Sequence, residues 1–204
     1  MLFGRRFLNG KLSDSSFVGN FAKRRRKILQ KNLENFSCPK NPDVENFIRK
    51  NSISFAKQYL SSVWIVFAKN ENKNSVVGYF ALLNKHFQVD LSNLSKTLAK
   101  RVQKFATFEE SLNRYVVSAP LIGQIGKNFS NDCNKLITGD ELLKIACEKV
   151  QEGQRILGGR IVYLECEDTP QLVNFYESNG FYNFGRRELK GEGKYLLQFL
   201  KYLK

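Results

Sequence analysis

One stretch of the chain, residues 114–167, constrains the fold more than any other because strand, helix and strand patterns follow one another there. "RYVVSAPLIGQIG" (114–126) is apolar and rich in β-branched residues, and its Pro120 predicts a bend or bulge in a long strand. Residues 138–153 carry apolar side chains at helical spacing, and "GGRIVYLECE" (158–167) predicts a second strand. Two strands joined through a helix are expected to be parallel, with a right-handed crossover.

The flanking segments add hairpins to this parallel pair, which makes the predicted sheet mixed. The other expected elements are a helix at 43–60, strands at 63–68 and 75–84, a helix at 91–106, a helix at 169–181, and strands at 182–189 and 194–203. We therefore predict an α/β fold with one mixed central sheet and helices on both of its faces.

The net charge of +14 is concentrated at the N-terminus. Residues 1–33 hold nine Lys and Arg side chains against a single acid, Asp14, and the stretch 21–33 predicts a short basic helix. We expect this arm to precede one domain over 34–204. A basic arm attracts polyanions, of which nucleic acid is the commonest in the cytosol. The alternative is a solvated tail that only aids solubility.

The cysteines and the single histidine limit the chemistry. No CxxC pair occurs among Cys38, Cys133, Cys147 and Cys166. With His86 as the one histidine, a His/Cys metal site is not expected. Unpaired thiols indicate a reducing compartment, and no long apolar run suggests a signal peptide or a membrane span. We expect a cytoplasmic protein with no metal and no membrane contact.

The start of the helix at 138–153 reads "TGDE", which is a capping signal. Thr138 can cap the helix while Glu141, three residues on, reaches back to it. Gly139 is poor helix material, and its free amide would suit an anion such as a diphosphate. The alternative is an ordinary capped helix, which Asp140 and Glu141 favour because they oppose a phosphate.

"NFYESNGF" (174–181) predicts a helix end, with Gly180 in the left-handed turn and Phe181 packed back under the helix. Tyr176 lies one turn before this stop. From the local sequence alone, a core tyrosine and a functional tyrosine are both consistent with this position.

The element order and several motifs resemble the GNAT acetyltransferase superfamily, and in particular its aminoacyl-tRNA-acetylating toxin branch. The motifs are "NFYESNGF", "PLIGQIGKN" (120–128), "VVGYFALLNK" (76–85) and "ENFSCPKNPDVENFI" (34–48). The likeness covers about 34–203 and leaves the basic arm outside. The family's diphosphate loop aligns with "NKLITG" (134–139), which keeps Gly139 but has Asn134 and Ile137 where the family has Gln or Arg and glycine.

The resemblance implies a sheet whose central parallel strands splay apart to admit acetyl-CoA as cosubstrate. It implies pantetheine on the backbone near Ile125, Gly126 and Lys127, and a coenzyme contact at Thr169. It places the diphosphate on the amides of Leu136, Ile137, Thr138, Gly139 and Asp140, and makes Asn134 and Lys135 further coenzyme-binding residues of the same loop. It makes Tyr176 the donor to the leaving thiolate, a role that suits a phenol of pKa about 10.

A general base is not evident from the sequence. Glu165, Glu167 and His86 qualify only by residue type. An α-amine, with a pKa of about 8, is partly neutral at pH 7 without help, whereas a lysine amine is not. The missing base therefore favours an α-amine acceptor.

Three functions stay open at this stage. The acceptor is the α-amine of an aminoacyl-tRNA, or it is a small-molecule or protein amine, or the chain is a non-catalytic nucleic-acid-binding module. In the first case the phosphates would be held by Arg24, Arg25, Arg26, Arg186 and Arg187. A homodimer and an antitoxin partner are both compatible with the sequence and are not decided by it.

Overall fold

The structure is a computed structural model. It describes residues 7–11, 33–70, 73–189, 191 and 193–204. The predicted basic helix lies outside these residues except for its last position, and so do Arg24, Arg25 and Arg26.

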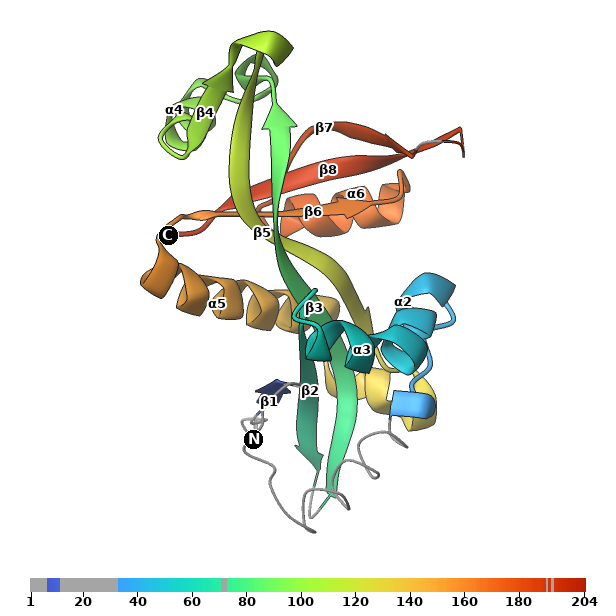
Figure 1. Cartoon of the computed structure of the whole chain (residues 1–204). Coiled ribbons are helices and arrows are strands. Elements are labelled where there is room, and N and C mark those ends of the chain that lie inside the picture. Colours follow the sequence, from blue (N-terminus) through green and yellow to red (C-terminus); the bar gives the residue numbers. More distant parts are fainter. Residues whose placement is uncertain (1–6, 12–32, 71–72, 190, 192) are drawn as a thin grey trace. The chain divides into compact units, whose positions relative to one another are not determined.

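The strands form one mixed sheet in the order β1-β2-β3-β5-β6-β8-β7, with β4 paired to β5 (Figure 1). Their bounds are β1 Phe7–Lys11, β2 Ser62–Asn70, β3 Lys73–Val89, β4 Ala106–Glu109, β5 Arg114–Lys127, β6 Ile161–Cys166, β7 Tyr182–Leu189 and β8 Lys194–Tyr202. The predicted parallel pair is β5 with β6. The pairs β1–β2, β2–β3, β4–β5, β6–β8 and β7–β8 are antiparallel. The predicted α/β class and the mixed sheet are confirmed.

The helices occupy the predicted segments with some local changes. The α-helices are α2 Pro42–Asn46, α3 Ser52–Lys57, α4 Lys96–Gln103, α5 Gly139–Leu157 and α6 Pro170–Ser178. The shorter turns are η1 Phe47–Asn51, η2 Leu91–Asn93, η3 Glu110–Leu112 and η4 Ser130–Leu136. The helix expected over 43–60 is thus interrupted at η1, which is a turn of π-helix. Within the described residues, no helix has both the length and the apolar character needed to cross a membrane.

The chain divides into two compact units. Unit 1 comprises 1–82 with 124–146, and unit 2 comprises 83–123 with 147–204. In unit 1, Val44 and Ile48 of the first helical segment pack in one cluster with Ile65 and Tyr79 of β2 and β3. Gly78, whose neighbour Tyr79 belongs to that cluster, lies instead against Leu142 of α5. Because adjacent strand residues face opposite sides of a sheet, α5 and the α2–α3 segment cover opposite faces.

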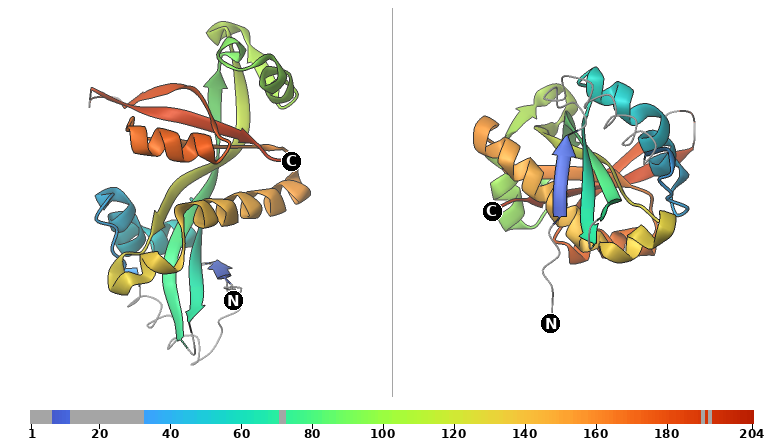
Figure 2. Two further views of the ribbon diagram at one scale, coloured as in Figure 1. Left: turned by 180° about the vertical axis from the view of Figure 1, so that it is seen from behind. Right: turned by 90° about the horizontal axis from the view of Figure 1, so that it is seen from below.

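Unit 2 repeats this arrangement with α4 and α6. Leu98 of α4 packs in one cluster with Tyr163 and Leu200, which pair across β6 and β8. The preceding residue of β8, Phe199, contacts the ring of Tyr176 on α6 instead. The helix α6 lies along β6 and β8 in both Figure 1 and the reverse view of Figure 2. Helices therefore cover both faces, as predicted.

Candidate active site

The central parallel strands pair over a short length. Their ladder contains two residue pairs, Leu121 with Tyr163 and Ile122 with Leu164. The strand β5 nevertheless continues to Lys127. Within the described part of the chain, the ladder between the central parallel strands thus ends before β5 does, as a splayed pair requires. A strand edge that leaves its ladder presents backbone groups that an extended ligand can pair with.

Gly126, on the far part of β5, lies in close contact with α2. A Cβ built on Gly126 would be 2.4 Å from Cγ1 of Val44 and 3.8 Å from Sγ of Cys38. No side chain fits there, so the backbone of β5 lies directly against the helix. The glycine fixes the position of the strand segment that the resemblance assigns to pantetheine.

The side chain of Lys127 holds the loop that follows β5. Its Nζ donates hydrogen bonds of 2.9 Å to the carbonyl oxygens of Asn134 and Ile137. Both residues belong to the loop at 134–140 that is predicted to bind the coenzyme. Lys127 therefore stabilises the loop through its ammonium group, in addition to the backbone role predicted for it.

Asn128 is a second organising residue, and the sequence reasoning missed it. Its Oδ1 accepts from the amides of Ser37 and Ser130, both at 3.0 Å, and its Nδ2 donates to the carbonyl oxygen of Val76 at 2.8 Å. The side chain is buried, so these bonds satisfy groups that water does not reach. The sequence signal for this role was the position of the asparagine directly after an apolar strand.

The first turn of α5 contains the predicted capping box. The amide of Thr138 donates to Oε2 of Glu141 at 2.7 Å, and the amide of Glu141 donates to Oγ1 of Thr138 at 3.1 Å. Within the described residues the amide of Gly139 has no partner. Ile137 is 2% exposed as a whole residue, and its carbonyl oxygen already accepts from the Lys127 ammonium.

The remaining loop residues lie at the surface or between these anchors. Lys135 forms an exposed ion pair with Asp132, with Nζ and Oδ1 3.1 Å apart. Leu136 is half-buried and Asp140 is exposed. Nothing in these contacts tests whether they bind a coenzyme.

Tyr176 lies in a ring cluster on α6. Its side chain is 6% exposed and contacts the rings of Phe175, Phe181 and Phe199, with centroids 5.1, 6.0 and 5.8 Å away. Burial, and then the nearby Cys166, raise the pKa of Tyr176 above its usual 10.0. The phenol therefore stays protonated at neutral pH.

The helix stop after Tyr176 is the one predicted. Gly180 has φ +76°, its amide donates to the carbonyl oxygen of Glu177 at 2.9 Å, and the amide of Phe181 donates to that of Tyr176 at 3.0 Å. These two hydrogen bonds define a Schellman motif. The ring of Phe181 also packs against the ring of Tyr176, as is common in this motif. At the other end of α6, Thr169 is the N-cap and accepts from the amide of Leu172 at 3.4 Å.

The predicted arginines of β7 have partners within unit 2. Arg187 forms a bidentate pair with Glu165, with distances of 2.8 Å (Nε–Oε1) and 2.6 Å (Nη2–Oε2). Arg186 lies over the ring of Tyr195, with its Cζ 5.1 Å from the centroid. Arg187 is thus paired with a carboxylate, while Arg186 makes a cation–π contact with Tyr195.

Glu165 is the half-buried member of the base candidates. Burial alone would raise its pKa, but hydrogen bonds from Arg187 and Gln198, with the charges of Arg187 and Lys85, lower it on balance. A carboxylate with a lowered pKa is a weaker base. Glu167 and His86 are both exposed. In the described residues, no group of three or more His, Cys, Asp and Glu side chains could hold a metal ion.

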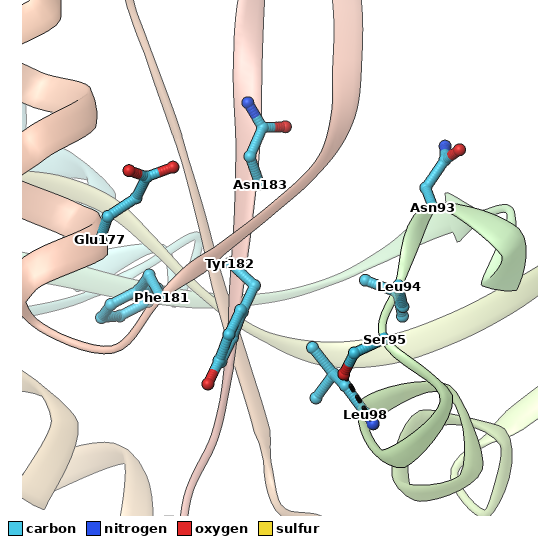
Figure 3. A pocket seen from close by; sticks show the side chains of 8 residues that line it. All are labelled: Asn93, Leu94, Ser95, Leu98, Glu177, Phe181, Tyr182 and Asn183. Carbon is cyan, nitrogen blue, oxygen red and sulfur yellow. Dashed lines mark hydrogen bonds between the residues drawn. The ribbon is translucent and has the colours of Figure 1, made fainter.

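A separate cavity of about 320 Å³ opens in unit 2, between the η2–α4 segment and the corner where α6 meets β7 (Figure 3). It uses none of the residues predicted from the sequence. No motif pointed to it, because it is formed by segments far apart in the chain.

Comparison with known proteins gives a match in fold. No protein-family profile matches the sequence, and no curated protein matches it. The structure of AtaT complexed with acetyl-methionyl-tRNAfMet superposes with a TM-score of 0.60 at 16% identity, over 94% of each chain.

Two further solved structures are similar. A tyrosine-to-phenylalanine mutant of the toxin AtaT, bound to the C-terminus of the antitoxin AtaR and acetyl-CoA, gives a TM-score of 0.57 at 16% identity, over 95% of this chain and 92% of that one. A tyrosine-to-phenylalanine mutant of KacT gives 0.59 at 12% identity, over 94% of each chain. The chain therefore has the fold of these toxins, as the resemblance implied.

Proposed function

We propose that this protein is an acetyl-CoA-dependent N-acetyltransferase, and that its acceptor is the α-amine of an aminoacyl-tRNA. The observation that carries the proposal is the two-pair ladder between β5 and β6 in a chain with the fold of AtaT. AtaT has been solved with acetyl-methionyl-tRNAfMet, with acetyl-CoA and with its antitoxin AtaR. The same partners, acetyl-CoA, tRNA and an antitoxin, are proposed for this chain.

The residues around the end of β5 fit such a cosubstrate. When bound, acetyl-CoA supplies the acetyl group as a thioester. The backbone of Ile125, Gly126 and Lys127 would hold the pantetheine arm, and the loop tied down by the Lys127 ammonium would hold the diphosphate. The free amide of Gly139 lies at the start of a 19-residue helix, where anions are favoured. Thr169 is proposed to contact the coenzyme in addition to capping α6.

Tyr176 is the proposed proton donor to the leaving thiolate. A thiolate leaves more easily when a weak acid donates a hydrogen bond or a proton to it. The phenol of Tyr176 is held by three aromatic rings, and burial keeps it protonated.

The acceptor amine is proposed to lose its proton without a dedicated side chain. Glu165, a base candidate by residue type, accepts hydrogen bonds from Arg187 and has a lowered pKa. Its carboxylate is therefore a poor base near pH 7. An α-amine with a pKa of about 8 is partly neutral at this pH. This supports an α-amine acceptor over a lysine side chain.

The charge supports a nucleic-acid substrate. The net charge of +14 and the cluster Arg24, Arg25 and Arg26 would attract phosphates, and Arg186 adds a cation on β7. The four free cysteines support a cytoplasmic location.

The test combines binding with turnover. Calorimetry should show heat on titration of acetyl-CoA, and labelled acetyl groups should transfer to charged tRNA. Tyr176→Phe should lower turnover at least about tenfold, because the donor is lost, while acetyl-CoA affinity changes less than about twofold. Tyr202→Phe, which removes a hydroxyl elsewhere in unit 2, is the matched control. Equal turnover in the Tyr176→Phe variant would refute the role of Tyr176.

A second candidate, a non-catalytic nucleic-acid-binding module, is favoured by one observation. The first turn of α5 carries Asp140 and Glu141, and the Glu141 carboxylate already occupies the amide of Thr138. Both features oppose a diphosphate. Absence of heat with acetyl-CoA, together with retained RNA binding, would establish this module. Salt-insensitive turnover on small amines would instead identify a small-molecule acetyltransferase.

A further inference from the structure

The cavity in unit 2 has an apolar floor and a polar rim. Leu94 and Leu98 from the α4 side and Phe181 from the β7 side form the floor, and all three are buried. Glu177 and Tyr182 stand at the rim, with Tyr182 54% exposed and placed between the two sides (Figure 3). A volume of about 320 Å³ lies at the lower end of the range for small-molecule sites.

The charge of the cavity is opposite to that of the whole chain. Glu177 is the charged residue among the described side chains that line it, whereas the chain carries +14. The carboxylate of Glu177 has no hydrogen bond or ion pair with any described residue. A cation entering the cavity would therefore find an acceptor that no side chain of the described fold already uses.

The neutral polar groups of the lining are mostly engaged within the fold. Oγ of Ser95 accepts from the amide of Leu98 at 3.3 Å, and Oδ1 of Asn183 accepts from the amide of Gly185 at 3.0 Å. Because Ser95 caps α4, the start of that helix is not a free anion site. Within the described residues, the hydroxyl of Ser95 and Nδ2 of Asn183 remain available as neutral donors, beside the Tyr182 phenol and the Glu177 carboxylate. The carboxylate is the charged group among them, and its charge favours a cation over an anion.

The aromatic rings of the cavity suit an ammonium group. Phe181 already has an ammonium over its ring, because Nζ of Lys201 lies 5.5 Å from its centroid while donating to the carbonyl oxygen of Asn179. The ring of Tyr182 is exposed and offers a second face. Aromatic faces beside a carboxylate recognise organic cations through cation–π attraction and direct charge pairing.

We propose that this cavity binds a small organic ammonium ion. Its apolar body would lie on Leu94, Leu98 and Phe181, and its charged nitrogen would lie between the Glu177 carboxylate and the Tyr182 ring. The site uses none of the residues assigned to acetyl transfer, so it can be tested independently of that function.

The experiment titrates the full chain with cyclohexylmethylammonium and, separately, with cyclohexylmethanol, its neutral counterpart of similar size. Backbone amide shifts in the NMR spectrum report the site. The amides of Asn93, Leu98, Tyr182 and Asn183 should move saturably with the ammonium, and the alcohol should bind at least about fivefold more weakly because it lacks the charge.

Variants separate the proposal from non-specific binding. Glu177→Gln should weaken ammonium binding about fivefold, to the level of the alcohol, and Tyr182→Ala should weaken it by a similar factor. Both positions are exposed or at the rim, so the fold should be retained. The matched control is Glu148→Gln on the exposed face of α5, which should leave the affinity unchanged. Absence of saturable shifts, or equal affinity in the Glu177→Gln variant, would overturn the proposal, as would equal binding of the alcohol.

Discussion

Gly126 shows how one residue fixes the end of β5 on α2. Because a Cβ at this position would lie 2.4 Å from Cγ1 of Val44, Gly126→Ala must displace the strand or the helix. We expect it to lower the free energy of unfolding by about 1–3 kcal/mol, as overpacking does. Urea denaturation of the purified variant measures this.

The neighbouring valine provides the control. In a Val44→Ala background the clashing methyl is gone, so Gly126→Ala should cost at least about 1 kcal/mol less than in the wild-type protein. Gly153→Ala on α5, where no atom lies within 4 Å of the added Cβ, should be neutral or slightly stabilising. Equal costs of Gly126→Ala in both backgrounds would contradict the steric explanation.

Among the elements, the three strands at the C-terminal end share one half-buried carboxylate. The carboxylate of Glu165 on β6 accepts a hydrogen bond of 2.8 Å from Nε2 of Gln198 on β8. It also accepts the bidentate pair of hydrogen bonds from Arg187 on β7. The Glu165 side chain is 14% exposed, whereas that of Arg187 is 49% exposed, so water reaches the arginine side of the pair. Because the folded state favours the carboxylate, the pKa of Glu165 in the fold lies below its usual 4.5.

This network should make stability depend on pH in a defined direction. A group with a lowered folded pKa stabilises the fold fully above its unfolded value, and that stabilisation is lost as the pH falls through the folded pKa. The difference in unfolding free energy between wild type and Glu165→Gln should therefore be largest near pH 7 and shrink below about pH 4.5. A difference that is constant with pH would contradict the assignment.

The sequence predicted the long elements and missed the short ones. Strong apolar patterns gave β2, β3, β5, β6 and the helix α5 near their observed bounds. The strands β1 ("FLNGK") and β4 ("ATFE") have little pattern of their own and are strands because β2 and β5 pair with them. The π-helical turn η1 was not predicted from the sequence, which indicated one continuous helix over 43–60.

The candidate site was predictable where it depends on local sequence. The capping box at Thr138 and Glu141 and the helix stop at Gly180 were both expected and both occur. The Lys127 bonds to the loop and the Glu165–Arg187 pair join residues whose contact depends on tertiary geometry. No spacing rule reveals such contacts from one sequence.

At the scale of the whole molecule, the N-terminal segment belongs partly to the fold. Strand β1 pairs with β2, and Leu33 is 1% exposed in the core of unit 1. Deleting residues 1–33 would therefore remove structure together with charge. A test of the arm has to change its charge alone.

Replacing Arg24, Arg25 and Arg26 together by Gln meets this condition. If these arginines contact tRNA phosphates, the slope of log affinity against log salt should become shallower by about 2, because three released counterions are lost. Acetylation of a small amine should be unaffected. The matched control replaces three exposed lysines of the α4 segment, Lys96, Lys100 and Lys104, by Gln, which removes the same charge. Equal slopes in the two triple variants would mean that overall charge, and no specific contact of the arm, attracts the tRNA.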